Sequence, residues 1–151
     1  MCIRDRTKVL FLCTGNSARS QMGEAYLRHH AGDRFEVFSA GLTPGGINPY
    51  TRRVMEEAGV SLEGQWSKDV REYLGRVNFG YLITVCGHAD QNCPRTFLSI
   101  GHKLHWDLED PAAFVGDDEA KMAKFREVRD QIEARVLAWL SELAVTPAQP
   151  A

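Results

Sequence analysis

Long apolar runs are missing from this chain: no stretch approaches the roughly 20 residues that a membrane-spanning helix needs. Residues 1–6 have no apolar centre, so they do not match a secretory signal. Charge of one sign is also scarce, since the formal net charge is −2 at pH 7. This balance gives no reason to expect a nucleic acid or an anionic membrane as a partner. Internal repeats, low-complexity tracts and linkers are absent as well.

Cysteine is rare, with four residues in 151. Cys2 lies in the hexamer 1–6, which we interpret as a non-native or disordered extension, and we assign it no role. The other three are an odd number, which argues against a closed framework of structural disulfides. Reduced, reactive thiols fit a cytoplasmic protein better. We therefore expect one cytoplasmic domain over 7–144, with a flexible tail at 145–151.

Apolar patterning predicts an α/β fold. Short apolar runs predict strands at Val9–Leu12, Phe35–Ala40, Tyr81–Cys86 and Lys103–Trp106. Helices are expected at Ser20–His30, from Asn48-Pro49 to Gly59, from Ser67 to Leu74, and from Asp117 along an apolar stripe that ends at Leu143. Strands that alternate with helices favour a parallel sheet covered on both faces, with ligands at the carboxyl ends of the strands.

The segment Cys13-Thr14-Gly15-Asn16-Ser17-Ala18-Arg19-Ser20 joins the first strand to the first helix. We expect Gly15 to permit an unusual turn, so that successive N–H groups converge on an anion at the helix N-terminus. Arg19 adds a planar fork suited to phosphate or arsenate oxygens. The positive potential of the loop N–H groups and Arg19 also favours a thiolate at Cys13. Such surroundings lower a thiol pKa from about 8.5 to between about 3.5 and 7.5. Ser17 and Ser20 are the expected hydroxyl donors to the sulfur.

Asp110-Pro111 supplies a candidate general acid. A thiolate that attacks an oxyanion expels an oxygen, and a carboxylic acid can protonate that leaving group. Proline directly after the aspartate restricts the backbone and helps to hold the loop shape.

Cys86 and Cys93 are seven residues apart, and they suggest chemistry in which electrons leave the protein. On a straight helix they would lie about 10.5 Å apart along the axis. A disulfide needs Cα atoms within about 7 Å. The segment between the two cysteines must therefore change shape if they become bonded.

Taken together, these motifs resemble those of a known protein family. The chain resembles the low-molecular-weight protein tyrosine phosphatase fold, and more closely the thioredoxin-coupled arsenate reductases built on it. The resemblance runs from about Val9 to Leu143, and it is strongest at 13–22, 39–41, 48–49, 88–94, 105–106 and 110–112. It implies a three-layer sandwich around a four-stranded parallel sheet.

The resemblance also implies roles for single residues. Cys13 would be the nucleophile, residues 14–20 with Arg19 the oxyanion site, and Asp110 the acid. Cys86 and Cys93 would form a redox relay that ends in a disulfide reduced by thioredoxin. Arsenate would be the substrate, phosphate and sulfate its competitors, and a monomer without cofactor the expected form.

Two alternatives remain open, and one departure from the family is visible. If Cys86 and Cys93 only pack, the chain is a phosphatase, although an aromatic rim near Asp110 is not evident. A second interpretation takes Cys86, His88, Cys93, His102 and His105 as zinc ligands, but their spacing is unusual and leaves the Cys13 loop unexplained. Some family members bind potassium through residues that match Asn16, Glu24 and Ser39, and we hypothesise that the Lys68 ammonium replaces that ion here.

Overall fold

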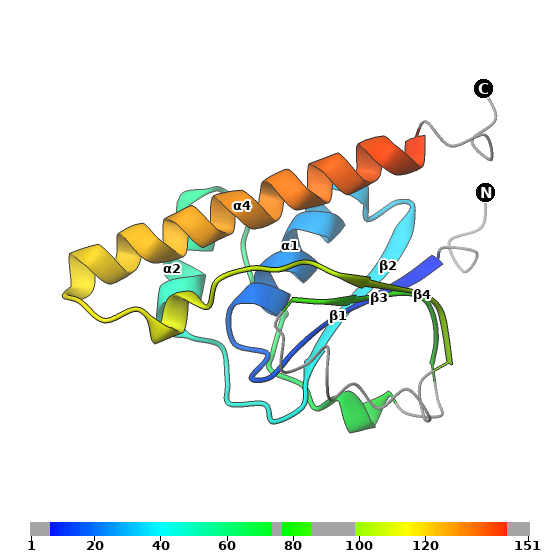
Figure 1. Cartoon of the computed structure of the whole chain (residues 1–151), viewed down its shortest axis with the longest axis horizontal. Helices are drawn as coiled ribbons and strands as arrows, with labels where there is room; N and C mark the ends of the chain where they lie inside the picture. Colours follow the sequence, from blue (N-terminus) through cyan, green and yellow to red (C-terminus); the bar gives the residue numbers. More distant parts are fainter. Residues whose placement is uncertain (1–6, 74–76, 86–98, 145–151) are drawn as a thin grey trace.

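The structure is a computed structural model that describes residues 7–73, 77–85 and 99–144. Four strands form one parallel sheet in the order β2-β1-β3-β4 (Figure 1). They are β1 (Thr7–Cys13), β2 (Phe35–Gly41), β3 (Asn78–Thr84) and β4 (Ser99–His105). The predicted four-stranded parallel sheet is thus confirmed.

The strands end together at one edge of the sheet. Cys13 at the end of β1 is in register with Gly41 of β2. On the other side of β1, Leu12 pairs with Thr84, which in turn pairs with His105 of β4. Since β1 and β3 are adjacent and parallel, the loop after β1 and the chain after Thr84 leave the sheet at the same edge.

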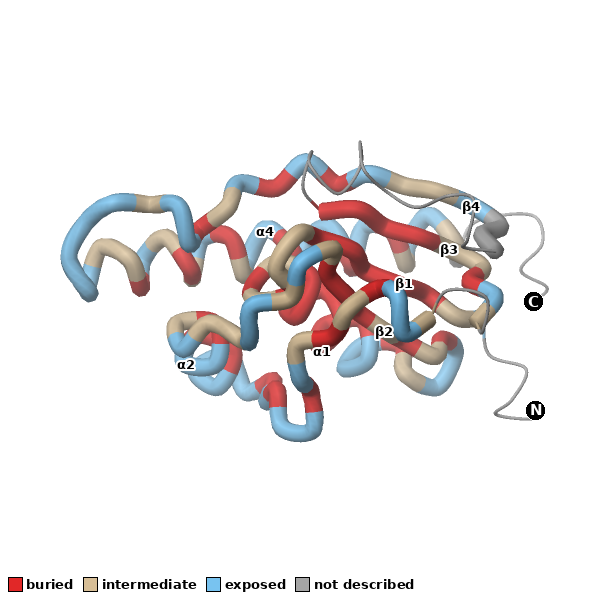
Figure 2. The backbone as a smooth tube through the Cα atoms, turned by 90° about the horizontal axis from the view of Figure 1, so that it is seen from below, coloured by how far each residue is buried: buried red, intermediate tan, exposed pale blue. Residues whose placement is uncertain are grey.

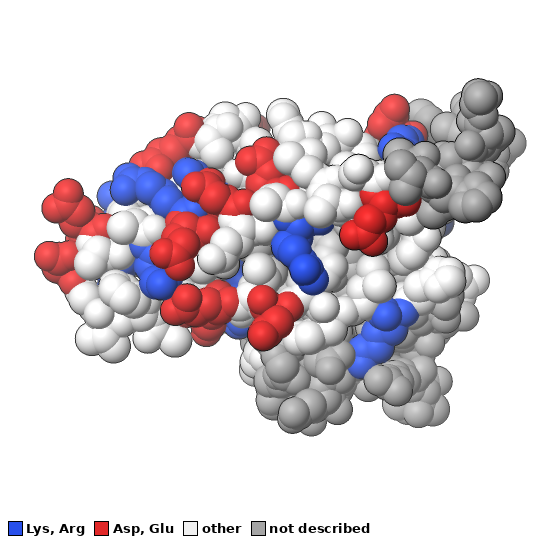
Figure 3. All heavy atoms as spheres, turned by 45° about the horizontal axis from the view of Figure 1, so that its top comes forward, with Lys and Arg blue, Asp and Glu red and all other residues white. Residues whose placement is uncertain are grey.

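Within the part of the chain that the structure describes, three α-helices accompany the sheet: α1 (Arg19–Ala31), α2 (Pro49–Glu57) and α4 (Asp118–Ala144). The predicted apolar stripe of α4 is buried at six positions: Met122, Phe125, Val128, Ile132, Val136 and Trp139. Buried residues are concentrated in the strands of the sheet and on the helix faces that meet it (Figure 2). Lys, Arg, Asp and Glu side chains are interspersed along the outer face of α4 (Figure 3). The core of the fold therefore lies between this helix layer and the sheet.

Aromatic rings mark the two faces of the sheet. On the face of α1 and α4, Phe11 meets Trp106 edge-on, with centroids 5.7 Å apart. On the opposite face, Tyr73 packs against Phe38 and Phe79 at 5.4 and 5.9 Å. Tyr73 directly follows the short 3₁₀ helix η2 (Val70–Glu72), drawn green below the sheet in Figure 1. Cover on both faces, as a three-layer sandwich requires, is confirmed.

Several predicted boundaries were wrong. The helix expected from Ser67 to Leu74 is only η2, which is capped by Asp69 because this carboxylate accepts from Arg71 N. Strand β3 begins three residues before the expected Tyr81, and β4 begins four before Lys103. Asn48 caps α2 as expected, through a 2.8 Å bond from Tyr50 N.

Within the described ranges, no helix combines the length and apolar character needed to cross a membrane. The extension 1–6 and the tail 145–151 lie outside these ranges.

Tyr26 supplies a testable feature of the core. Its ring is buried between α1 and α4, and its hydroxyl has no hydrogen-bond partner among the described residues. Burial, reinforced by the charge of Glu133, raises the pKa of Tyr26 to about 12.

Tyr26→Phe is expected to leave the stability at pH 7 unchanged or higher, because it removes a buried hydroxyl that is not paired. Between pH 10 and 12 the unfolded chain loses the Tyr26 proton while the folded chain keeps it, so stability falls by up to about 1.4 kcal/mol per pH unit. The Phe variant should lose less stability over this window. Urea unfolding at pH 7 and at pH 11 measures both effects, and an equal alkaline loss in the two proteins would contradict the assignment.

Candidate active site

Backbone hydrogen bonds fix the loop after β1 from outside. Three successive carbonyl oxygens accept bonds of 2.8 to 3.1 Å from the segment after β2: Cys13 from Leu42, Thr14 from Thr43, and Gly15 from Gly45. The Ser17 carbonyl accepts in the same way from Asn48 N at 3.0 Å. The loop carbonyls are therefore turned toward neighbouring chain and not toward the cavity that the loop lines.

The N–H groups of the same loop are available to a ligand. Those of Gly15, Ser17 and Ala18 donate to no acceptor in the described ranges. Ala18 is the N-cap of α1, and no side chain caps that helix. Because unpaired N–H groups and the helix dipole both favour negative charge, this helix start is suited to an anion.

The unusual backbone turn lies one residue later than expected. Asn16 has a positive φ of 49°, whereas Gly15 does not adopt the left-handed region. Gly41 is the glycine that the loop requires, since a Cβ there would lie 2.7 Å from Thr14 O and 2.9 Å from Asn16 N. The prediction that Gly15 makes the turn was thus wrong, and the close approach of Gly41 allows β2 to support the loop.

Cys13 lies at the bottom of this loop and is 3% exposed. Its Sγ accepts from Asn16 N at 3.0 Å and lies 2.8 Å from Ser20 Oγ. Ser20 Oγ itself accepts from Asn16 Nδ2 at 2.8 Å, so its own hydrogen is free to point at the sulfur. Two donors to one sulfur favour the thiolate. Ser20 is confirmed as a sulfur contact, whereas no hydrogen bond joins Ser17 Oγ to Cys13.

A buried polar network continues behind Asn16. Its Nδ2 also donates to Ser39 Oγ at 3.0 Å, and Ser39 Oγ donates to Glu24 Oε1 at 2.5 Å. The Nζ of Lys68 lies 3.4 Å from Glu24 Oε1 and donates to Trp66 O at 2.8 Å. Every side chain in this chain of contacts except Trp66 is buried, so the loop conformation is tied to a buried charge pair.

Burial and a neighbouring carboxylate have opposite effects on the pKa of Lys68. The side chain is 3% exposed, and burial lowers its pKa below the ordinary value although the Glu24 carboxylate opposes this shift. Arg28 forms a second ion pair with Glu24. The ring of Trp66 stands over the ammonium at 4.7 Å from its centroid, which adds a cation–π contact. Lys68 thus lies with Asn16, Glu24 and Ser39, where the sequence comparison anticipated it.

Arg19 and Asp110 complete the cavity above Cys13. This cavity of about 430 Å³ is lined by Cys13, Thr14, Gly15, Ser17, Ala18, Arg19, Asp110 and Ala112. Arg19 Nη1 donates to Leu108 O at 3.0 Å and to Val85 O at 3.3 Å, which holds the guanidinium over the loop. Its Nη2 lies 3.7 Å from Asp110 Oδ2. Asp110 is half-exposed, and its Oδ1 accepts from Ala112 N.

The structure therefore brings together most of the predicted residues, but not all. The side chains of Asn16 and Ser20 lie behind the loop and do not line the cavity. Cys86 and Cys93 lie outside the described residues, so their proximity to Cys13 stays a prediction. The zinc interpretation depends on the same two cysteines. Among the described residues, no three His, Cys, Asp or Glu side chains are grouped in a way that suits a metal ion.

Sequence reasoning missed the glutamine pair that braces Asn16. Gln21 Nε2 donates to both Asn16 O and Asn16 Oδ1, at 3.1 and 3.0 Å. Gln65 Nε2 in turn donates to Gln21 Oε1 at 2.7 Å. Gln21 precedes Met22 in the helix after the loop, and a buried glutamine carries no periodic signal. Ser67, expected to cap a helix, instead bonds Gly15 O at 3.2 Å.

Comparisons with known proteins agree with this geometry. Residues 8–148 match the family described as low molecular weight phosphotyrosine protein phosphatase. An arsenate reductase of Halalkalibacterium halodurans is 42% identical over 129 residues, which are 85% of this chain and 91% of the relative.

Solved structures give the same result. An arsenate reductase in the oxidized state superposes with a TM-score of 0.76 at 29% identity, covering 90% of this chain and 98% of its own. A thioredoxin-dependent arsenate reductase of Corynebacterium glutamicum gives a TM-score of 0.68 at 30% identity, covering 93% of this chain and 63% of its own. The sequence match and the fold coincide over most of the chain, which belongs to the low molecular weight phosphotyrosine protein phosphatase family.

Proposed function

We propose that this protein is an arsenate reductase. The Cys13 site supports thiolate attack on a tetrahedral oxyanion, since it holds a sulfur with two donors beneath unpaired loop N–H groups and the Arg19 guanidinium. The choice of arsenate as that oxyanion rests on the relatives. Relatives that align over most of the chain are arsenate reductases, which supports the same activity here.

The first step would be attack of the Cys13 thiolate on arsenic(V). The loop N–H groups and Arg19 Nη2 would hold the remaining oxygens, because Arg19 Nη1 is already engaged by two carbonyls. Asp110 would protonate the oxygen that leaves as water. Its half-exposed carboxyl, close to Arg19 in the same cavity, is placed to do so.

The second stage would be a relay of thiols. Cys86 attacks Cys13 Sγ, the bond to arsenic breaks, and its electron pair reduces arsenic(V) to arsenic(III), which leaves as arsenite. Cys93 then attacks Cys86, which frees Cys13 and leaves a Cys86–Cys93 disulfide. Each exchange is attack of a thiolate on sulfur, and the two electrons come from two thiols. Thioredoxin would reduce the final disulfide, which fits the thioredoxin dependence of the Corynebacterium relative.

The phosphatase alternative is weaker. Phosphate and arsenate have similar shapes, so the loop does not distinguish them, and we expect phosphate and sulfate to compete. The described lining of the cavity contains no aromatic side chain to hold an aryl phosphate. A phosphatase also needs neither Cys86 nor Cys93. We expect at most a weak phosphatase side activity. We also expect the protein to be a cytoplasmic monomer that needs no cofactor.

A single-turnover experiment tests the proposal without any reductase. Fully reduced protein is mixed with arsenate, and both arsenite and remaining thiols are counted. We expect two thiols to disappear for each arsenite formed. Arsenite without thiol loss, or rapid hydrolysis of aryl phosphate without any arsenite, would refute the proposal.

Lys68 leads to a prediction about ions. Its ammonium contacts Glu24 beside Ser39 and Asn16, so we propose that it fills the place of a bound cation. Turnover is therefore expected to be equal in potassium, sodium and choline chloride at matched ionic strength. A marked rise in rate with potassium alone would contradict this role for Lys68.

A further inference from the structure

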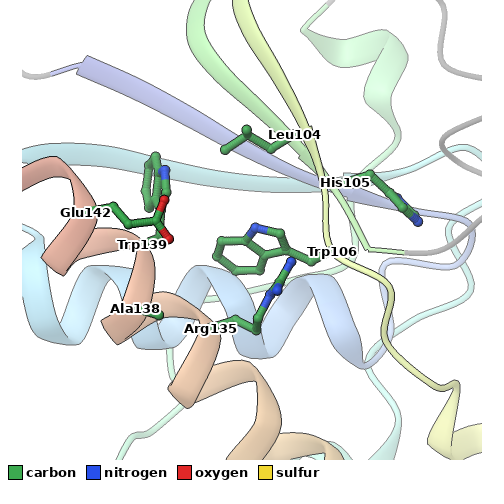
Figure 4. A pocket seen from close by; sticks show the side chains of 7 residues that line it. All are labelled: Leu104, His105, Trp106, Arg135, Ala138, Trp139 and Glu142. Atoms are coloured by element: carbon green, nitrogen blue, oxygen red, sulfur yellow. The ribbon is translucent and has the colours of Figure 1, made fainter.

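A second cavity lies between β4 and α4. It has a volume of about 220 Å³ and shares no lining residue with the cavity above Cys13. Trp106, which follows β4, and Trp139 and Arg135 of α4 form its walls (Figure 4). This volume is below the about 300 Å³ at which most pockets for drug-sized ligands begin, so an occupant can be no larger than a small organic molecule.

Two indole N–H groups in this cavity lack partners. Trp106 and Trp139 are 5% and 7% exposed, and neither indole nitrogen has a hydrogen-bond partner in the described part of the chain. In the described ranges, the side-chain polar atom that is fully enclosed and has no partner is Tyr26 Oη. The two indole nitrogens are therefore not fully enclosed and keep some access to solvent. Figure 4 shows their nitrogen-bearing edges on the cavity side of the rings. Because no protein group in the described ranges accepts from them, both N–H groups are free to donate to an acceptor that enters the cavity.

Arg135 adds a positive charge that is not neutralised. Its guanidinium carbon lies 5.5 Å from the centroid of the Trp106 ring. Of the four other basic residues of α4, Lys124, Arg126 and Arg129 each pair with a carboxylate, whereas Lys121 has no such pair in the described ranges and does not line the cavity. Arg135 forms no such pair within the described ranges. It is exposed and lines the cavity, so its fork of donors is free to hold a carboxylate.

The remaining walls restrict the class of ligand. Leu104 and Ala138 offer apolar contacts beside the two indole rings. Glu142 lies at the same cavity and has no ion-pair partner in the described ranges, so it disfavours anions of high charge. His105 is held through Nδ1 by Thr84 Oγ1 at 2.8 Å, which fixes its ring at the rim.

We propose that this cavity binds a small organic monocarboxylate with an apolar body. Arg135 and the indole N–H groups hold the carboxylate, while Leu104, Ala138 and the rings cover the apolar part. The site is separate from the Cys13 loop and does not depend on the function proposed for that loop.

A titration with phenylacetate, followed through the tryptophan indole signals in ¹H–¹⁵N spectra, tests this proposal. The chain has three tryptophans, and Trp66 serves as an internal control because it lies outside the cavity. Trp106→Phe identifies the signals. We expect those of Trp106 and Trp139 to move in a saturable way while that of Trp66 stays fixed. Signals that do not move, or that move equally with neutral phenylacetamide, would overturn the proposal.

Two variants and one competitor make the test specific. Arg135→Gln removes a charged hydrogen bond at an exposed position and is expected to weaken phenylacetate binding by about tenfold or more. Arg52→Gln, a matched change on the exposed face of α2, should leave binding unchanged. Unaltered affinity in Arg135→Gln, or displacement of phenylacetate by inorganic phosphate, would contradict a carboxylate site built on Arg135.

Discussion

Cys13→Ser is expected to abolish arsenate reduction while leaving the protein folded. A serine hydroxyl is not ionised at neutral pH and cannot form the bond to sulfur that the relay requires. Removal of the catalytic nucleophile lowers kcat by about six orders of magnitude in a serine protease, and we expect a loss of at least about four orders here. The hydroxyl can keep the contacts to Asn16 N and Ser20 Oγ, so the fold should persist.

The measurement is arsenite formed per protein molecule, with thermal unfolding followed by circular dichroism. Cys2→Ser is the matched control, since Cys2 lies in the segment 1–6 that we interpret as an extension, and we assign it no role. We expect this control to match the parent protein in both readouts. If Cys13→Ser kept more than a small residue of the parent rate, Cys13 would not be the nucleophile.

Asn16→Ala is expected to lower both stability and activity strongly. The Asn16 side chain is fully buried and takes part in bonds to Ser20, Ser39, Gln21 and the N–H of Lys68. Each buried group left without a partner costs about 1–3 kcal/mol, so we expect a loss of at least 3 kcal/mol in the free energy of unfolding. Because the sulfur contacts shift with the loop, kcat should fall by about a hundredfold.

Asn16→Gly separates the two causes. It removes the same side chain but accepts the positive φ of 49° without strain. A non-glycine residue in this region pays about 1–2 kcal/mol, so the Ala variant should be less stable than the Gly variant by about 1 kcal/mol. Urea unfolding and kcat are compared for both proteins. Parent-like stability in either variant would show that the network does not support the loop.

The sequence predicted the framework of the site because its signals were local. An apolar run ends at Cys13, a helix begins near Ser20, and Asn48-Pro49 starts α2 where expected. These two elements, β1 and α1, place Arg19 at the start of the helix, whereas its guanidinium is held over the loop by Val85 O and Leu108 O from distant segments. The approach of Asp110 to Arg19 does not follow from a local pattern, because the two residues belong to distant segments of the chain that meet only at the cavity.

What the sequence could not predict depends on contacts between distant segments. The positive φ belongs to Asn16 and not to Gly15, because buried bonds from Gln21 and Lys68 hold Asn16 from outside the loop. Ser67 is drawn to Gly15 O, so it does not cap a helix. The backbone conformation of Asn16 and the hydrogen-bond partner of Ser67 thus depend on tertiary contacts. Neither hydrophobic periodicity nor capping preference predicts such contacts.

The most direct test of the central proposal is arsenate-dependent oxidation of NADPH in the presence of thioredoxin and thioredoxin reductase, with Cys93→Ser measured alongside. We predict continuous turnover by the parent protein and at most one equivalent of arsenite from Cys93→Ser, because the variant stops at the Cys13–Cys86 disulfide. No arsenate-dependent oxidation by the parent, together with rapid aryl phosphate hydrolysis that Cys93→Ser retains, would contradict the account and identify a phosphatase.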